Sequence, residues 1–284
     1  MNYDKVGPTA WSVAYQRTLA DIKYSKEIFD ELASMIASAD LNQRDYFEKS
    51  KTSKYSTIRI EARYKLINRI LEWQRPVQVF EIAAGLSPRG LSMAEANPDL
   101  TYVELDLPGM TNEKRRILSQ IEAKFKRRIP NLNIEPGDAL EYESLFAATK
   151  HFRHGNIAVI NEGLLRYLNF EQKAKVSQNV HQLLENFGGI WITPDITLRQ
   201  VIMSEGGYGE RQSMKELAGM DIYANSFRDV EHAKDFFTQQ GFQVEPHSYR
   251  EIEDELVSPA KLGMSREEVI EAINNGAVFL MRIR

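Results

Sequence analysis

The feature that most constrains the fold is a strand, a small-residue turn, a helix and a second strand within residues 77–108. The first strand is predicted over Val77–Ala83, an apolar run typical of a strand buried in a parallel sheet. The turn Ala84-Gly85-Leu86 follows, and a helical pattern extends from Ser87 to about Asn97. The second strand is predicted over Thr101–Leu105. This order predicts a parallel α/β unit that binds a ligand at the carboxyl ends of its strands.

Asp106, which follows the second predicted strand, suits a nucleoside ligand because its carboxylate can accept hydrogen bonds from both ribose hydroxyls. Dinucleotide enzymes and S-adenosylmethionine (SAM) methyltransferases both use such a unit. The dinucleotide pattern G-x-G-x-x-G would need glycine where this sequence has Ala83, Gly85 and Pro88. Because two glycines are missing, a pyrophosphate site is disfavoured. The pattern E-I-A-A-G instead resembles the first motif of class I methyltransferases.

Composition excludes several other classes of protein. The chain has 284 residues, no cysteine and a formal net charge of −4, so disulfides, thiolate metal sites and bulk attraction to nucleic acid or anionic membranes are not expected. No signal peptide is recognised, and no apolar run approaches the roughly 18 residues of a membrane helix. We therefore expect a cytoplasmic protein with no membrane partner.

Two further patterns have ordinary explanations. The basic stretch Asn112–Arg128 is compatible with a nucleic-acid footprint, but the acidic balance of the chain favours a solvated helix face, so no nucleic-acid partner is expected. His151 and His154 are three residues apart without an accompanying acidic cluster, so no metal site is expected.

Five more strands are predicted beyond the first two, and helical patterns separate most of them. Together the seven strands predict a Rossmann-like α/β fold with a mostly parallel sheet and an antiparallel last strand. The additional strands are Leu132–Glu135, Ile157–Ile160, Ile190–Thr193, Phe242–Tyr249 and Ala277–Ile283. The helices include one capped by Asn169 and one that opens with a capping box at Ser265 and Glu268.

Two segments do not follow the α/β alternation. Residues 1–75 have helical patterns, interrupted by a loop predicted over Lys49–Ser56, and are interpreted as an amino-terminal cap over the ligand edge or as a brace. Residues 76–284 would form the methyltransferase domain. Within it, residues 196–228 lack a strand and are predicted to form a lid, with a flexible Gly206–Gly209 and a short helix near Ser213–Ala218.

Acidic residues at the ends of the first four predicted strands should converge on one crevice, since these ends meet at the same edge of the sheet. These residues are Glu81, Asp106, Asp138 and Glu162. SAM offers a ribose diol, an adenine amine, an ammonium group and a sulfonium cation to such carboxylates. Its own carboxylate needs a cation, for which Arg17 and Arg63 are the candidates.

Six stretches between residues 9 and 168 together resemble the leucine carboxyl methyltransferase family, which includes bacterial O-methyltransferases of polyketide-type metabolism. They are T-A-W-S-V-A-Y-Q-R (Thr9–Arg17), A-R-Y-K-L-I (Ala62–Ile67), E-I-A-A-G-L-S-P-R (Glu81–Arg89), Y-V-E-L-D-L-P (Tyr102–Pro108), G-D-A-L (Gly137–Leu140) and N-E-G-L-L-R-Y-L (Asn161–Leu168). The sequence departs from the family at Ser87-Pro88, where an aspartate and a threonine are usual.

The resemblance implies a role for each matching residue in binding SAM. Arg63 would bind the SAM carboxylate, Gly85 would line the cofactor turn and Asp106 would hold the ribose. Asp138 and its neighbour Ala139 would contact the adenine, and Glu162 would contact the amino-acid end.

The expected function is SN2 transfer of the SAM methyl group to a carboxylate or hydroxyl oxygen of a small molecule or a peptide terminus. A carboxylate is already ionised at neutral pH, and no general base is identified in the sequence. The absence of an N/D-P-P-Y pattern after the fourth strand argues against methylation of a base amine. The alternatives are a non-catalytic SAM-binding module and a nicotinamide-dependent oxidoreductase.

Overall fold

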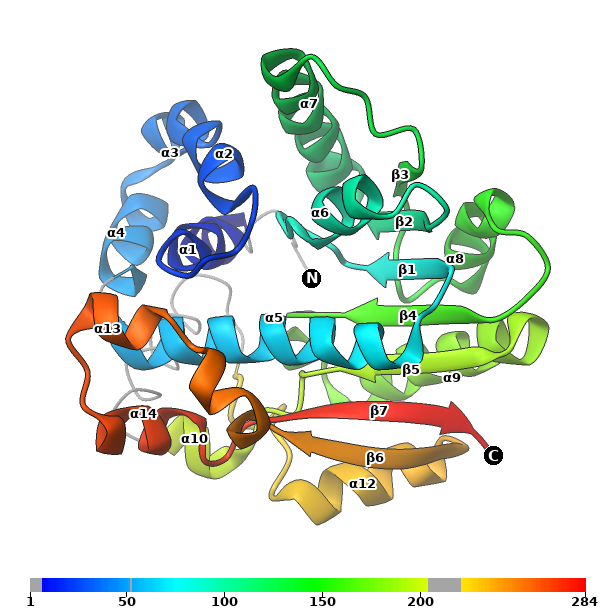
Figure 1. Ribbon diagram of the computed structural model, residues 1–284. Coiled ribbons are helices and arrows are strands. Elements are labelled where there is room, and N and C mark those ends of the chain that lie inside the picture. The colour runs from blue at the N-terminus through cyan, green and yellow to red at the C-terminus, as the bar shows by residue number, and fades with distance from the viewer. Residues whose placement is uncertain (1–6, 52, 204–220) are drawn as a thin grey trace.

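The structure is a computed structural model and describes residues 7–51, 53–203 and 221–284. Seven strands form one sheet in the order β3-β2-β1-β4-β5-β7-β6 (Figure 1). Strand β7 lies between β5 and β6 and is antiparallel to both, whereas β1 to β5 pair in parallel. The predicted fold class is confirmed. The strands are β1 Gln78–Ile82, β2 Thr101–Asp106, β3 Leu132–Pro136, β4 Ile157–Asn161, β5 Gly189–Thr193, β6 Phe242–Ser248 and β7 Ala277–Ile283.

Helices cover both faces of the sheet, which is why every residue of β1 and of β4 is buried. Two hydrophobic clusters, one on each face, form the core. The first face carries α5 (Lys54–Gln74), α6 (Arg89–Ala96), α7 (Pro108–Phe125), α13 (Ser258–Leu262) and α14 (Arg266–Ile273). The second face carries α8 (Tyr142–Ala148), α9 (Phe170–Phe187) and α12 (Val230–Gln239).

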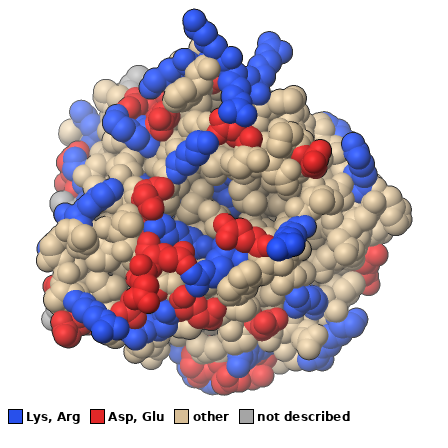
Figure 2. Space-filling model, in the orientation of Figure 1, with Lys and Arg blue, Asp and Glu red and all other residues tan. Residues whose placement is uncertain are grey.

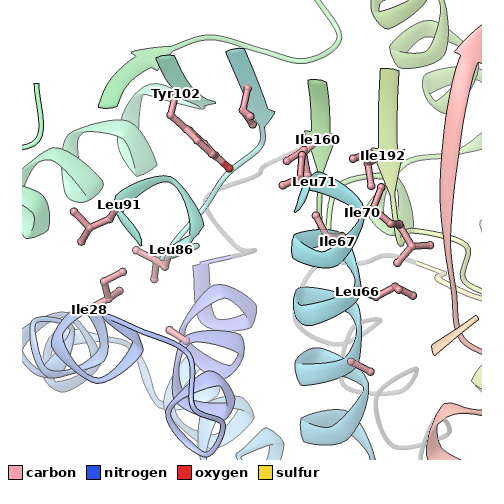
Figure 3. Packing of buried hydrophobic residues seen from close by; sticks show 14 of the residues in the cluster. Ile28, Leu66, Ile67, Ile70, Leu71, Leu86, Leu91, Tyr102, Ile160 and Ile192 are labelled. Carbon is pink, nitrogen blue, oxygen red and sulfur yellow. The ribbon is translucent and has the colours of Figure 1, made fainter. Parts of the chain in front are cut away.

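Helix α5 lies lengthwise across the first face of the sheet (Figure 1). Its fully buried Ile67 and Ile70 belong to the same cluster as Ile160 of β4 and Ile192 of β5, as Figure 3 shows. The helix begins after Ser53, whose hydroxyl accepts a hydrogen bond from the backbone N–H of Ser56. The core is therefore continuous across residue 75, and the division into a cap and a methyltransferase domain stays a prediction.

Four shorter helices lie beyond the carboxyl ends of the parallel strands (Figure 1). They are α1 (Gly7–Thr18), α2 (Ser25–Asp30), α3 (Ala33–Ser38) and α4 (Leu41–Ser50). The loop predicted over Lys49–Ser56 is wrong in extent, since α4 continues to Ser50 and α5 begins at Lys54. Polar residues there form helix ends and the cap of α5 rather than a long loop.

The segment predicted as a lid is described only at its two flanks. Leu198 and Phe227 form a parallel bridge, and α10 (Arg199–Met203) follows the first of them. The predicted flexible Gly206–Gly209 and the short helix near Ser213–Ala218 lie outside the described residues.

The basic stretch forms α7 and the turn after it. Lys124, Lys126, Arg127 and Arg128 are exposed, and lysine and arginine side chains project at the top of Figure 2, where α7 ends. Lys114, in contrast, is buried. In the described part of the chain, no helix is long and apolar enough to cross a membrane.

Gly189, at the start of β5, lies at a close contact between strands β5 and β4. Its φ is +111°, and a Cβ placed there would lie 2.0 Å from the carbonyl oxygen of Ile157 on β4. We expect Gly189→Ala to lower the free energy of unfolding by about 3 kcal/mol or more, because an L side chain is strained at this φ and the two strands must separate. Urea unfolding measures the change.

Gly109→Ala in α7 is the matched control, since a Cβ there meets nothing within 4 Å. It should be neutral or stabilise by up to about 1 kcal/mol. Equal stabilities of the two variants would contradict the proposed clash.

Candidate active site

A cavity of about 370 Å³ lies at the carboxyl ends of β1 to β4, within the size range of small-molecule sites. Its lining includes all but one of the residues predicted to bind the cofactor. These are Arg17, Arg63, Gly85, Asp106, Asp138, Ala139 and Glu162. The sheet order places Asp138 after β3, Asp106 at the end of β2, the Gly85 turn after β1 and Glu162 after β4, so they follow one another along the edge.

The turn after β1 has an unusual backbone. Ala83 and Gly85 have φ of 53° and 52°, in the left-handed region that a non-glycine residue such as Ala83 rarely adopts. The Gly85 N–H donates to Asp106 Oδ2 at 2.6 Å, and the Ser87 N–H donates to the Ala84 carbonyl at 3.0 Å. No atom lies within 4 Å of a Cβ placed on Gly85, so the backbone of the turn faces open space in the cavity.

Asp106 ends β2 and faces the cavity from a nearly buried position. Its second oxygen, Oδ1, accepts the N–H of Leu107 at 2.7 Å. Burial raises the pKa of Asp106, and the backbone N–H groups of Gly85 and Leu107 oppose that shift. Because each carboxylate oxygen can accept more than one hydrogen bond, Asp106 retains capacity to accept hydrogen bonds from a diol.

Glu162 is the centre of a cluster of three arginines. Its Oε1 lies 2.7 Å from Arg17 Nη2 and 2.8 Å from Arg63 Nε, and its Oε2 lies 2.6 Å from Arg89 Nη2. Burial opposes ionisation of Glu162, but the charges of the three arginines outweigh it and hold its pKa well below the usual range. The cluster therefore places excess positive charge beside the cavity.

Glu81 was expected at the cavity, but the structure places its side chain elsewhere. It lies inside β1 rather than after it, is 1% exposed and is absent from the cavity lining. Its carboxylate accepts hydrogen bonds from Arg89 Nη1 at 2.5 Å and from the hydroxyl of Tyr102 at 2.7 Å. Glu81 thus orients Arg89, which in turn contacts Glu162, and its direct binding of a cofactor stays a prediction.

Sequence reasoning missed Lys114, whose Nζ holds the turn after β1 in place. It donates to the carbonyl oxygens of Gly85 at 3.2 Å and Ser87 at 2.6 Å, and it lies 2.9 Å from Glu104 Oε2. Burial raises the pKa of Glu104 to about 7, against the opposing charge of Lys114. The sequence does contain a sign of this role, because Lys114 shares the otherwise uncharged buried face of the helix with Thr111, Ile117 and Ile121.

Asp195, after β5, shapes the loop that carries Glu162. Its carboxylate accepts hydrogen bonds from Asn161 Nδ2 and from the backbone N–H groups of Gly163, Leu164 and Leu165, all at 2.7–2.9 Å. An acid after a strand that neighbours β4 was the sequence signal for this role.

The fold is shared with solved structures, among them an O-methyltransferase. The O-methyltransferase NcsB1 from neocarzinostatin biosynthesis, in complex with SAM and 2-hydroxy-5-methyl naphthoic acid, superposes with a TM-score of 0.52 at 14% identity over 98% of this chain and 69% of that chain. NcsB1 in complex with S-adenosyl-L-homocysteine (SAH) and 1,4-dihydroxy-2-naphthoic acid gives 0.51 at 13% identity over 90% and 61%. The pyocyanin biosynthetic protein PhzM gives 0.51 at 13% identity over 88% and 61%.

The chain thus spans 61% to 69% of the length of these structures, and at this identity the likeness concerns the fold alone. The fold and the strand-end acids define the class as a Rossmann-like fold of the methyltransferase type. The model of the leucine carboxyl methyltransferase family matches residues 10–181, so the chain belongs to that family. No curated protein matches the sequence.

Proposed function

We propose that the protein is a SAM-dependent O-methyltransferase that methylates an oxygen already ionised in solution, with a carboxylate of a small molecule as the favoured acceptor. The observation that carries the proposal is the order of charges along the carboxyl edge of the sheet. Carboxylates at Asp138 and Asp106 are followed by the open turn at Gly85 and then by Glu162 with its arginines. This order complements a nucleoside joined to a zwitterionic amino acid.

The cavity residues fit the chemical groups of SAM. Asp106 would accept hydrogen bonds from the ribose hydroxyls, and Asp138 with Ala139 would contact the adenine. Arg17 and Arg63, which line the cavity, would hold the amino-acid carboxylate, and Glu162 would face its ammonium group. The apolar wall, which includes Leu86, Leu105, Met110 and Leu140, would exclude water from the reacting atoms.

When bound, SAM supplies a methyl group on a sulfonium, and transfer joins that carbon to an acceptor oxygen while sulfur keeps the electron pair of the broken bond. The protein's own task is to orient the two groups and to exclude water. A second cavity lies beside this one. No histidine occurs among the described residues that line either cavity. All carboxylates among that described lining already accept hydrogen bonds from protein groups; they are Asp106, Glu113, Asp138, Glu162 and Asp195. An acceptor that arrives ionised needs no base, which favours a carboxylate over a hydroxyl.

The comparisons add support for a small-molecule acceptor. NcsB1 was crystallised with naphthoic acids, which carry both a carboxyl and a hydroxyl group. The family name refers to carboxyl methylation of leucine, so a peptide carboxyl terminus is the alternative acceptor.

Calorimetric titration with SAM, SAH and NADH tests the cofactor. We expect micromolar binding of SAM and SAH and no binding of NADH, because the turn after β1 lacks the glycines of a pyrophosphate site. Transfer of a labelled methyl group from SAM to a panel of carboxylic acids, phenols and peptides then tests the reaction. Binding of NADH without SAM would overturn the proposal, and SAM binding without turnover on any acceptor would indicate a non-catalytic module.

A further inference from the structure

A second cavity, of about 360 Å³, lies beside the first at the carboxyl edge of the sheet. Its wall is built from α1, α4, α5, the short helix η3 (Leu165–Tyr167), the residues after β5, α10, Tyr249 and residues 272–277. The two cavities share part of their lining, which we call the junction. The junction residues are Thr9, Val13, Arg63, Arg166 and Tyr167.

Lysine and arginine side chains line the second cavity both at the junction and away from it. Arg63 and Arg166 belong to the junction, whereas Arg59 and Lys49 line the second cavity alone. Arg59 precedes Arg63 by four residues on α5, which corresponds to about 6 Å along the helix axis. The Arg59 Nε donates to the carbonyl oxygen of Ala272 at 2.8 Å, and the Arg63 Nε is held by Glu162, so the two guanidinium groups are anchored apart.

The described lining carries more positive than negative charge. Four cationic side chains line the second cavity, of which Arg63 is paired with Glu162 and Lys49 with Asp45, and the acidic residue among the described lining is Asp195. The Asp195 carboxylate already accepts four hydrogen bonds from the loop after β4. The lining therefore favours an anionic ligand.

Apolar side chains line the cavity together with these cations. Ile60, Ile196 and Leu198 are buried at the wall, and Val201 and Ile202 of α10 contribute to it. A ligand that fits such a lining has an apolar body and acidic groups at its ends.

We propose that the second cavity is the acceptor site and that it selects a dicarboxylic acid with an apolar body. One carboxylate lies at the junction, where it accepts the methyl group, and the other is bound by Arg59, with Lys49 as the second cation. This inference rests on the proposed function, and it adds the substrate class and a specificity-determining residue, Arg59.

Paired acids of equal length test the proposal by direct binding. Adipic, suberic and sebacic acids are titrated against hexanoic, octanoic and decanoic acids, with and without saturating SAH, using wild type and Arg59→Met. We expect at least one diacid to bind the wild type about 10- to 100-fold more tightly than its monoacid, because a second charge-assisted contact is made. Arg59→Met should lose most of that preference, with Lys49 left as the one cation at that end, and should leave SAH affinity unchanged.

Two further variants separate charge from folding. Arg59→Lys keeps the cation and should retain most of the preference for the diacid. Lys54→Met removes a positive charge from the exposed start of the same helix, outside both cavities, and should leave the preference intact.

The inference is overturned if no diacid binds more tightly than its monoacid, or if Arg59→Met weakens both members of a pair equally. These outcomes are independent of the cofactor. Failure of SAM and SAH to bind would overturn the proposed function, whereas equal affinity for diacid and monoacid in a protein that binds SAM would overturn the inference alone.

Discussion

Replacing Asp106 by alanine should weaken the binding of SAM and SAH by about 100-fold or more. The carboxylate would accept two charge-assisted hydrogen bonds from the ribose, each contributing about 1.5–3 kcal/mol. It also receives the N–H groups of Gly85 and Leu107, so its removal releases the turn that lines the cavity. Isothermal calorimetry measures the loss.

Asp99→Ala is the matched control for this variant, because Asp99 is exposed at the opposite end of β2. It should bind SAM as the wild type does. Asp106→Asn keeps the shape and one acceptor oxygen and should show an intermediate loss. Wild-type affinity in a folded Asp106→Ala variant would contradict the placement of the ribose at the end of β2.

Replacing Glu162 by glutamine should lower the free energy of unfolding by about 3–5 kcal/mol at neutral pH. The side chain of Glu162 is 1% exposed and contacts Arg17, Arg63 and Arg89. Without its charge, three nearly buried guanidinium groups repel one another, and the amide has one oxygen fewer to accept their hydrogen bonds. Urea unfolding at pH 7 measures the change. Glu113→Gln, whose carboxylate pairs with the partly exposed Arg116, should cost less than about 1 kcal/mol.

The effect of Glu162→Gln should depend on pH in a defined direction. The folded-state pKa of Glu162 is depressed, so its stabilisation is fully present above the unfolded-state value of about 4.3. As the pH falls below about 4, the unfolded chain takes up a proton that the folded wild type does not. The stability difference between wild type and Glu162→Gln should therefore shrink with acidification. A difference that stays constant from pH 7 to about pH 3.5 would contradict the assigned charge state.

Local sequence signals were sufficient to predict the strands and the edge where the site lies. The run Ile157–Ile160 is apolar because both faces of the strand are covered. The side-chain period of a strand and the residues of its turns can be read from neighbouring positions in the sequence. Asp106, Asp138 and Glu162 lie at or just after the ends of their strands, and parallel strands end at one edge. The sequence by itself therefore determined the fold class, and most of the residues that it predicted for the cofactor line one cavity.

Only the tertiary structure decided which charged groups reach the cavity and which support it. Glu81 belongs to a strand buried on both faces, so Arg89 and Tyr102 rather than the cavity surround its carboxylate. Lys114 reaches the Gly85 turn from α7, and Asp195 reaches the loop after β4 from the end of the next strand. The second cavity combines α1, α4 and α5 with α10 and residues 272–277, which are far from them in the chain. These contacts join segments that are distant in the sequence. The spacing of neighbouring residues does not indicate which buried charged side chain contacts which partner.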